Sequence, residues 1–302
     1  MGDIFGILIV RPFGLALTAL YNVIGSYGLA VIIFALIVKL VLLPFAYKGK
    51  KSMLKMNKVQ KQLAELQKKY ANNRVKLNEE MQKLYDREGV SPMSGCLPSF
   101  LPLPIMMGLY YAVVKPMTFM MGLSSSDINM LAAKVGIEVT AQNSFTVQPQ
   151  IAQACNQFFD AAGNLDPAIA SLSENIANNL FPINFHFFGL NLADKPTFTF
   201  SVLLLIPILS GATAFLSSYI MQKMQGANAS AANSSMKTML YLMPLMSVWF
   251  GFQFPAAIGI YWIFNNVISC VQEVVMTGII RKRHPMEPEE TGKKKKKKKE
   301  EA

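Results

Sequence analysis

GLAVIIFALIVKLVLLPFAY, residues 28–47, is an almost wholly apolar run that contains a single ammonium group, that of Lys39. A helix of about 20 apolar residues crosses the hydrocarbon core of a bilayer, so this stretch predicts a transmembrane helix. A charge near the centre of such a helix costs roughly 2.5 to 3.5 kcal/mol on insertion scales. Two explanations for Lys39 stay open. Its long stem reaches the interface, or its ammonium meets water, a counter-ion or a cavity.

The composition extends this prediction to the whole chain. Hydrophobic residues make up 52% and charged residues 16% of the 302 residues, which is typical of a polytopic membrane protein. Cys96, Cys155 and Cys270 are far apart and form no C-x-x-C pair, so we expect no disulfide framework, no metal and no cofactor. The chain also lacks the phosphate-loop, dinucleotide, zinc-protease and serine-hydrolase motifs. We therefore expect a protein that is not an enzyme.

Residues 1–27 precede the first predicted span and contain an apolar run that Arg11-Pro12 interrupts. Only Gly25 to Tyr27 separate this run from the span, which leaves little chain for a turn between two full spans. We predict an amphipathic helix that lies in the membrane interface, with Arg11 and Asn22 toward water. A further transmembrane helix, or an uncleaved signal segment, remains the alternative.

Residues 48–94 are polar and basic, with ten lysines and two arginines against five acids. Apolar residues recur at helical spacing at Val59, Leu63 and Leu66, and again at Leu77 to Leu84 after Asn72-Asn73. This pattern predicts two amphipathic helices in an antiparallel hairpin that ends at Gly89. Most of the lysines then form a solvated face, and some meet anionic headgroups.

Four more apolar segments predict spans, and two polar regions separate them. Prolines at the start of the second predict a distorted helix or one that begins late. The remaining regions are span two (95–121), an extracytoplasmic segment (122–197), span three (198–222), a linker (223–235), span four (236–252), span five (255–280) and a basic tail (281–302).

The charge distribution orients these spans. The segment from 122 to 198 holds two lysines and six acids, whereas 48–94 carries a net charge of plus seven and the tail contains seven consecutive lysines, 293–299. By the positive-inside rule the basic regions are cytoplasmic and the acidic segment is outside. The predicted fold is an all-α polytopic membrane protein. It is a five-transmembrane-helix bundle in the plasma membrane with an N-terminal interfacial helix, a cytoplasmic helical hairpin, the N-terminus outside and the C-terminus inside.

Two compositional features allow more than one interpretation. Many of the nineteen methionines, Met106 among them, lie in or beside spans. They either fill the core and face lipid, or form an adaptable surface for variable apolar partners. The lysine tail binds either anionic lipid or nucleic acid, with ribosomal RNA as the largest nearby candidate.

Several motifs resemble the YidC family of membrane protein insertases and its mitochondrial and chloroplast relatives. A basic residue five positions before a proline, here Lys39 and Pro44, is similar to the family's first core span. The opening of the second span and the last two spans also match. The matching residues there are Gly95-Cys96-Leu97-Pro98, Pro104, Leu109-Tyr110, Met243-Pro244, Phe254-Pro255, Gly259, Ile260, Tyr261-Trp262 and Asn266.

This resemblance implies a hydrophilic groove that is open to the cytoplasm and to lipid and closed outside. A polar client tail would enter the groove while the client's apolar helix moves into lipid. The implied partners are nascent membrane proteins, the ribosome, the Sec translocon and anionic lipids. The implied groove residues are Lys39, Met106, Tyr261, Trp262 and Asn266, and the implied structural-motif residues are Pro44, Gly95, Cys96, Pro98, Pro104 and Pro255.

Three differences from the family qualify the resemblance. Lys39 stands where many members have arginine, which keeps the charge and loses the bidentate fork. Pro102 stands where many have glutamine. The chain shows no lipobox-type cysteine near Met1 and no large domain before the core, which resembles the short form found in Gram-positive bacteria. We expect an insertase and chaperone, with a non-catalytic assembly scaffold and a small transporter as alternatives.

Overall fold

The computed structural model describes residues 6–89, 102–144, 147–225 and 234–283. Most of these residues are helical, and two short antiparallel strands form the sheet. In chain order the elements are η1 (Gly6–Val10), α2 (Arg11–Ile24), α3 (Tyr27–Lys69), α4 (Arg74–Glu88), α6 (Pro102–Val114), α7 (Pro116–Phe119), α8 (Ser125–Lys134), α9 (Gln148–Cys155), η3 (Asn156–Phe158), α10 (Pro167–Ala170), α11 (Glu174–Asn179), β1 (His186–Phe187), β2 (Leu190–Asn191), η4 (Val202–Leu204), α12 (Leu205–Gln225), α14 (Ser234–Gln253) and α15 (Ala256–Arg283).

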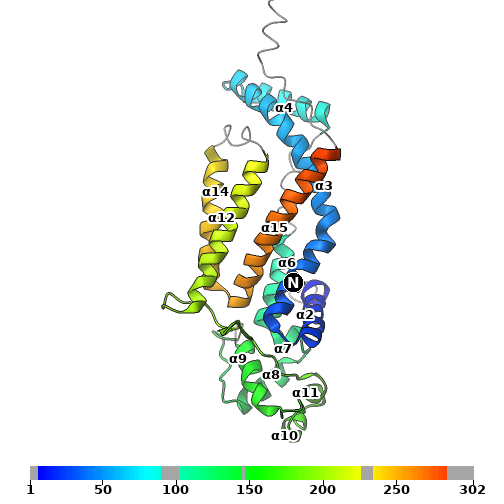
Figure 1. Cartoon of the computed structure of the whole chain (residues 1–302), viewed down its shortest axis with the longest axis vertical. Coiled ribbons are helices and arrows are strands. Elements are labelled where there is room, and N and C mark those ends of the chain that lie inside the picture. The colour runs from blue at the N-terminus through cyan, green and yellow to red at the C-terminus, as the bar shows by residue number, and fades with distance from the viewer. Residues whose placement is uncertain (1–5, 90–101, 145–146, 226–233, 284–302) are drawn as a thin grey trace, which may run out of the picture.

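The four longest helices lie side by side in the order α14, α12, α15, α3 (Figure 1). α4 lies at the top of Figure 1, next to one set of ends of these long helices, and the helices α8 to α11 lie beyond their opposite ends. Three helical segments are long and apolar enough to cross a membrane, Tyr27–Lys55, Val202–Met224 and Ala256–Ile280. This agrees with an all-α membrane protein, and the count of five spans stays a prediction.

The first predicted span is part of a much longer helix. α3 continues without a break from Tyr27 to Lys69 and contains Pro44, so the predicted boundary between 47 and 48 is a change of composition within one helix. Lysine, glutamine, leucine and methionine, which dominate its second half, are all strong helix formers. The polarity of the side chains changes there while the backbone hydrogen bonding continues.

α4 folds back on the end of α3. Asn73 caps its start by accepting a hydrogen bond from the backbone of Lys76 at 3.0 Å, and Gly89 ends it in the left-handed conformation. Val59 of α3 and Leu84 of α4 are buried against each other's helix, as their helical spacing predicts. The two helices therefore share a small apolar core of their own.

The second predicted span is described only from Pro102. α6 ends at Val114, where Lys115-Pro116 interrupts the helix before the single turn of α7. The motif residues Gly95, Cys96 and Pro98 lie outside the described residues. Pro104 lies in the first turn of α6 and is exposed, a position where helices tolerate proline.

Glycines allow α12 to approach its neighbours closely. A Cβ on Gly211 of α12 would lie 2.2 Å from Val248 of α14, and a Cβ on Gly259 of α15 would lie 2.2 Å from Ile206 of α12. Small residues at such contacts let membrane helices pack backbone to backbone, where lipid provides no hydrophobic drive for association.

The N-terminal helix α2 packs along one face only. Gly14 and Leu17 are buried, and the hydroxyl of Thr18 donates to the backbone oxygen of Met120 at 3.1 Å. η1 runs directly into α2, so the helical segment Gly6–Ile24 has 19 residues, five from η1 and 14 from α2, and extends about 28 Å at 1.5 Å per residue, close to a bilayer core of about 30 Å. Its length fits both the interfacial helix and the alternative of a further span. Arg11 and Asn22 are exposed, as the interfacial interpretation expects.

The 122–197 segment forms a compact unit whose core continues into the long helices. Its helices α8 and α11 begin at Ser124 and Ser173, each of which caps the helix with its side chain. The ring of Phe185 packs edge-on against that of Tyr27, with centroids 4.9 Å apart. Ala256 at the start of α15 donates its backbone N–H to the oxygen of Asp194 at 2.8 Å.

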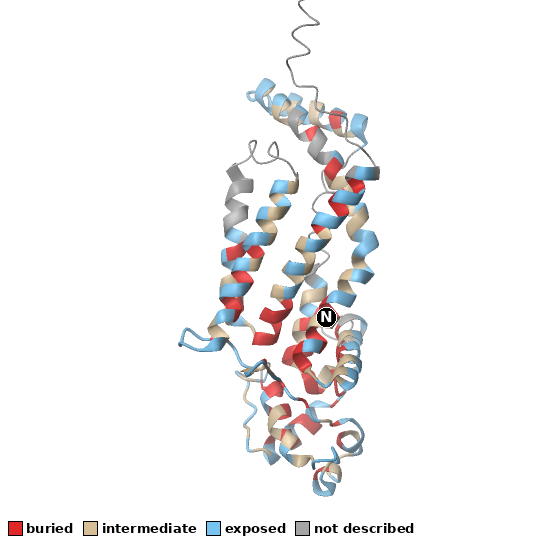
Figure 2. Cartoon of the chain, viewed as in Figure 1, coloured by how far each residue is buried: buried red, intermediate tan, exposed pale blue. Residues whose placement is uncertain are grey.

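Most buried residues lie where the long helices meet α2, α6 and the 122–197 segment (Figure 2). Smaller groups lie between α3 and α4 and where the end of α15 meets α3. Elsewhere the long helices expose large apolar side chains, as expected for surfaces that face lipid.

Candidate functional site

Lys39 lies half-buried on α3 and points to α15. Its ammonium donates a hydrogen bond to the hydroxyl of Ser269 at 2.8 Å, and that hydroxyl donates to the backbone oxygen of Asn265 at 2.6 Å. Within the described part of the chain no carboxylate pairs with Lys39. The hydroxyl of Ser269, a neutral group, thus holds the ammonium in place.

Four polar or amphipathic residues form a stripe along one face of α15. Trp262, Asn266, Ser269 and Glu273 follow one another at steps of four, three and four residues, the spacing that keeps side chains on one helical face. We call this set the α15 stripe. Each member meets a different partner on the surrounding helices.

Two of the sequence-predicted groove residues belong to this stripe and find partners on two helices. Asn266 donates its amide to the hydroxyl of Thr213 on α12 at 3.3 Å. The indole N–H of Trp262 lies 3.1 Å from the sulfur of Met106 on α6, so these two predicted residues are in contact. Trp262 also packs edge-on against Phe254, with centroids 5.6 Å apart.

The structure brings Lys39, Trp262, Met106 and Asn266 together around the stripe, but it places Tyr261 elsewhere. Tyr261 is only 4% exposed and belongs to the hydrophobic core. Its neighbour in sequence, Trp262, faces the stripe because adjacent helical residues point in directions about 100° apart. No pattern in the sequence distinguishes the positions of these two aromatic residues.

The three motif prolines in the described residues all belong to helices that build the site. Pro44 is exposed within α3, Pro104 lies in the first turn of α6, and Pro255 is buried immediately before α15. The oxygen of Pro255 accepts the N–H of Ile258 at 2.9 Å, which closes the first turn of α15. These prolines shape the helices around the site and do not touch Lys39.

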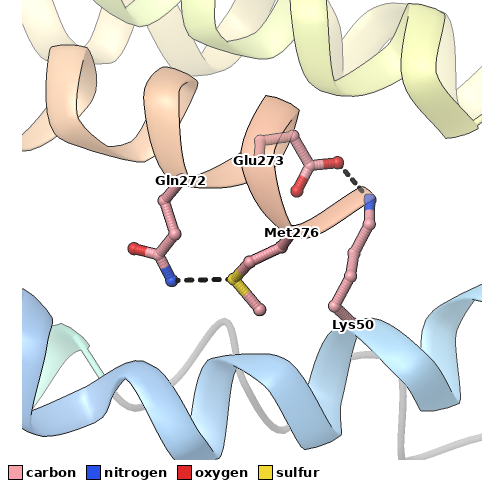
Figure 3. Close-up of polar contacts among 4 residues, drawn as sticks. All are labelled: Lys50, Gln272, Glu273 and Met276. Atoms are coloured by element: carbon pink, nitrogen blue, oxygen red, sulfur yellow. Dashed lines mark hydrogen bonds and ion pairs between the residues drawn. The ribbon is translucent and has the colours of Figure 1, made fainter. Parts of the chain in front are cut away.

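The last member of the stripe, Glu273, forms a buried ion pair with Lys50 of α3 (Figure 3). The side chains of Lys50 and Glu273 are 4% and 10% exposed. Sequence reasoning placed Lys50 among the solvated lysines and therefore missed it. Glu273 could have revealed this ion pair, because a carboxylate in an apolar span requires a cationic partner.

The described residues contain no cluster of three or more potential metal ligands. A cation, a hydroxyl, an amide and an indole on the inner face of apolar helices can instead hold polar groups of another chain in an otherwise apolar region. Ser269 and Thr213 complete this set and were missed, because single hydroxyls carry no pattern in a sequence.

The chain is similar to one family model and to many curated proteins. The model described as "60Kd inner membrane protein" matches residues 19–283. The membrane protein insertase YidC 2 of Bacillus anthracis is 27% identical over 274 residues, which cover 89% of this chain and 79% of that protein. The insertase YidC of Clostridium perfringens is 29% identical over 273 residues, covering 90% and 87%. The insertase MisCA of Bacillus subtilis is 25% identical over 291 residues, covering 95% and 84%.

Proposed function

Because the chain belongs to the 60Kd inner membrane protein family, whose similar members are named insertases, we propose that it inserts client proteins into the membrane. This family membership confirms the resemblance on which the sequence interpretation relied. In the proposal the chain works without catalysis as an insertase and chaperone, and Trp262, Asn266 and Ser269 of the α15 stripe line, with Lys39, a hydrophilic groove open to the cytoplasm.

The observation that carries this proposal is that the Lys39 ammonium is hydrogen-bonded to a neutral hydroxyl. It lies on an apolar helix, and a hydroxyl is its hydrogen-bond partner in the described residues. A full charge without a counter-ion in such surroundings is costly. The cost is reduced when water enters beside it, and it is offset when an acidic residue of a client arrives.

The proposed mechanism divides the client between two environments. The short polar tail enters beside Lys39, Ser269 and Asn266, whose polar groups replace part of its hydration. The client's apolar helix slides along the exposed apolar surfaces of the neighbouring helices into lipid, and this transfer drives the process. The aromatic and methionine side chains near Trp262 provide an adaptable apolar wall.

The orientation in the membrane is part of the proposal and is supported by charge. The α4 end carries the basic residues of 48–94 and the acidic 122–197 segment lies at the opposite end, so the positive-inside rule puts α4 in the cytoplasm. The N-terminus is then outside and the tail inside. The basic hairpin and tail would contact the ribosome and anionic lipids, and the Sec translocon is a further partner in this proposal.

Reconstitution tests the insertase proposal against a scaffold. The purified chain is placed in liposomes with a single-span client that has a short acidic tail, and protease protection of the tail is measured. Protection well above that in empty liposomes supports insertion. Binding of the client without protection would contradict it and favour the scaffold. A client with a long, folded tail is the matched control, because the groove accommodates only short polar segments.

A further inference from the structure

Lys50 and Glu273 form an ion pair in the buried region where the end of α15 meets α3. Both residues are less than a tenth exposed, and Met276, near Glu273 on α15, accepts a hydrogen bond from the amide of Gln272 (Figure 3). Glu273, Met276, Thr277 and Ile280 are all buried and share the face of α15 that packs against α3. The carboxylate is therefore enclosed between two helices.

The Lys39 ammonium donates to Ser269, which precedes Glu273 by four residues on the same face of α15. Ser269 and Glu273 are therefore separated by about one helical turn, a rise of about 5.4 Å along α15. The flexible side chains of Lys39 and Glu273 can extend toward each other between these two positions. Two cations thus compete for one carboxylate.

The outcome of this competition sets the charge available to a client. With Glu273 bound to Lys50, the Lys39 ammonium keeps its charge uncompensated. Without Lys50, the carboxylate would be left unpaired in an apolar region, and pairing with Lys39 is the nearest way to relieve that cost. The local charge at Lys39 would then fall from plus one to zero.

We propose that Lys50 is a positioning residue that holds the Glu273 carboxylate away from Lys39 and so keeps the Lys39 ammonium free for acidic residues of a client. This inference rests on the proposed function for its purpose. The competition itself is independent of insertion and can be measured separately.

Carbodiimide coupling measures the competition directly. A hydrophobic carbodiimide activates a carboxyl group, and an adjacent lysine amine then forms an amide while the reagent leaves as its urea. Peptide mass spectrometry of the purified full chain should show a Lys50–Glu273 product in the wild type. In Lys50→Met the product should join Lys39 and Glu273 instead.

Lys50→Arg is the matched control, because arginine keeps the ion pair but forms no amide under these conditions. This variant should yield little Lys39–Glu273 product. Equal yields in Lys50→Arg and Lys50→Met, or no Lys39–Glu273 product in Lys50→Met, would overturn the proposal. Lys50→Gln repeats the test in case Lys50→Met does not purify as a folded protein.

Insertion of two clients then separates positioning from simple structural support. For Lys50→Met, the protected amount of an acidic-tail client relative to a neutral-tail client should fall about fivefold, as expected when one charge attraction is lost. Lys50→Met/Glu273→Gln lacks the ion pair as well, yet it leaves Lys39 charged and should restore the wild-type ratio. If the ion pair only stabilised the fold, the protected amounts of both clients would fall in both variants.

The two experiments fail in different ways. If the wild type protects neither client, the proposed function is wrong and the coupling pattern still decides the competition. If the coupling switches to Lys39 while the client ratio stays unchanged, Lys50 has no positioning role and the inference is wrong.

Discussion

Phe187 of β1 lies so close to Gly28 of α3 that a Cβ on the glycine would lie 2.3 Å from Cγ of the phenylalanine ring. The contact joins the 122–197 segment to the first turn of the longest helix. Next to it, Phe188 adopts a φ of 49°, in the left-handed region that a bulky side chain rarely occupies. The tight turn that follows Phe187 therefore holds the ring against the helix.

We predict that Gly28→Ala loosens this contact and destabilises the protein by about 1 to 3 kcal/mol, the usual cost of overpacking a close contact. Thermal unfolding in detergent measures the change. Gly278→Ala is the control, since it is also a helical glycine and no atom lies within 4 Å of the position of its Cβ. A Gly28→Ala protein as stable as Gly278→Ala would show that Phe187 moves aside without cost.

Acid should weaken the start of α8. The Ser124 hydroxyl donates to the Asp127 carboxylate at 2.6 Å and lowers the pKa of that carboxyl to about 2, with a further hydrogen bond from Asn175. A lowered pKa adds stability that is present above the ordinary value of 3.8 and is lost as the pH falls through about 2. The stability difference between wild type and Asp127→Asn should be constant near neutral pH and shrink between these two values.

The control for this titration is Glu138→Gln, which removes an exposed carboxylate from the same segment. Its stability difference from wild type is measured over the same pH range for comparison. If the Asp127→Asn difference persists undiminished at the lowest pH, the hydrogen bonds of the carboxylate contribute nothing specific to the ionised form.

Cys155 should report on the opening of the 122–197 segment. It is 1% exposed, and burial raises the pKa of its thiol to about 12. The thiolate is the reactive form, so a maleimide should leave Cys155 unlabelled in the folded protein and label it fully in denaturant. Peptide mass spectrometry gives the labelled fraction. Rapid labelling of the folded wild type would mean that this core opens readily.

The sequence predicted those parts of the fold that depend on long, uniform patterns. The apolar run 28–47 and the helical spacing of Val59, Leu63 and Leu66 were enough to place α3 and its contact with α4. The sequence did not show that one helix continues across residues 47 and 48, because the composition changes there from apolar to basic although both halves favour helix.

Short helices and strands, and contacts between residues far apart in the chain, could not be predicted from the sequence. α9 and the two-residue strands β1 and β2 are too short to produce a recognisable period in the sequence. Lys50 and Glu273 are separated by 223 residues, so no local spacing relates them. Such a pair is visible only when the helices are placed side by side.

The last prediction concerns the effect of the Lys39 charge on the insertion of clients. Lys39→Arg keeps a cation that can still donate to Ser269, so it should insert acidic-tail clients at close to the wild-type level. Lys39→Ala loses the attraction and should reduce their protection roughly fivefold to tenfold, with a smaller effect on neutral-tail clients. The measurement is protease protection of both clients in liposomes of identical protein content. Equal protection by all three proteins, for both clients, would mean that Lys39 only extends its ammonium to water and that the polar stripe of α15 acts without it.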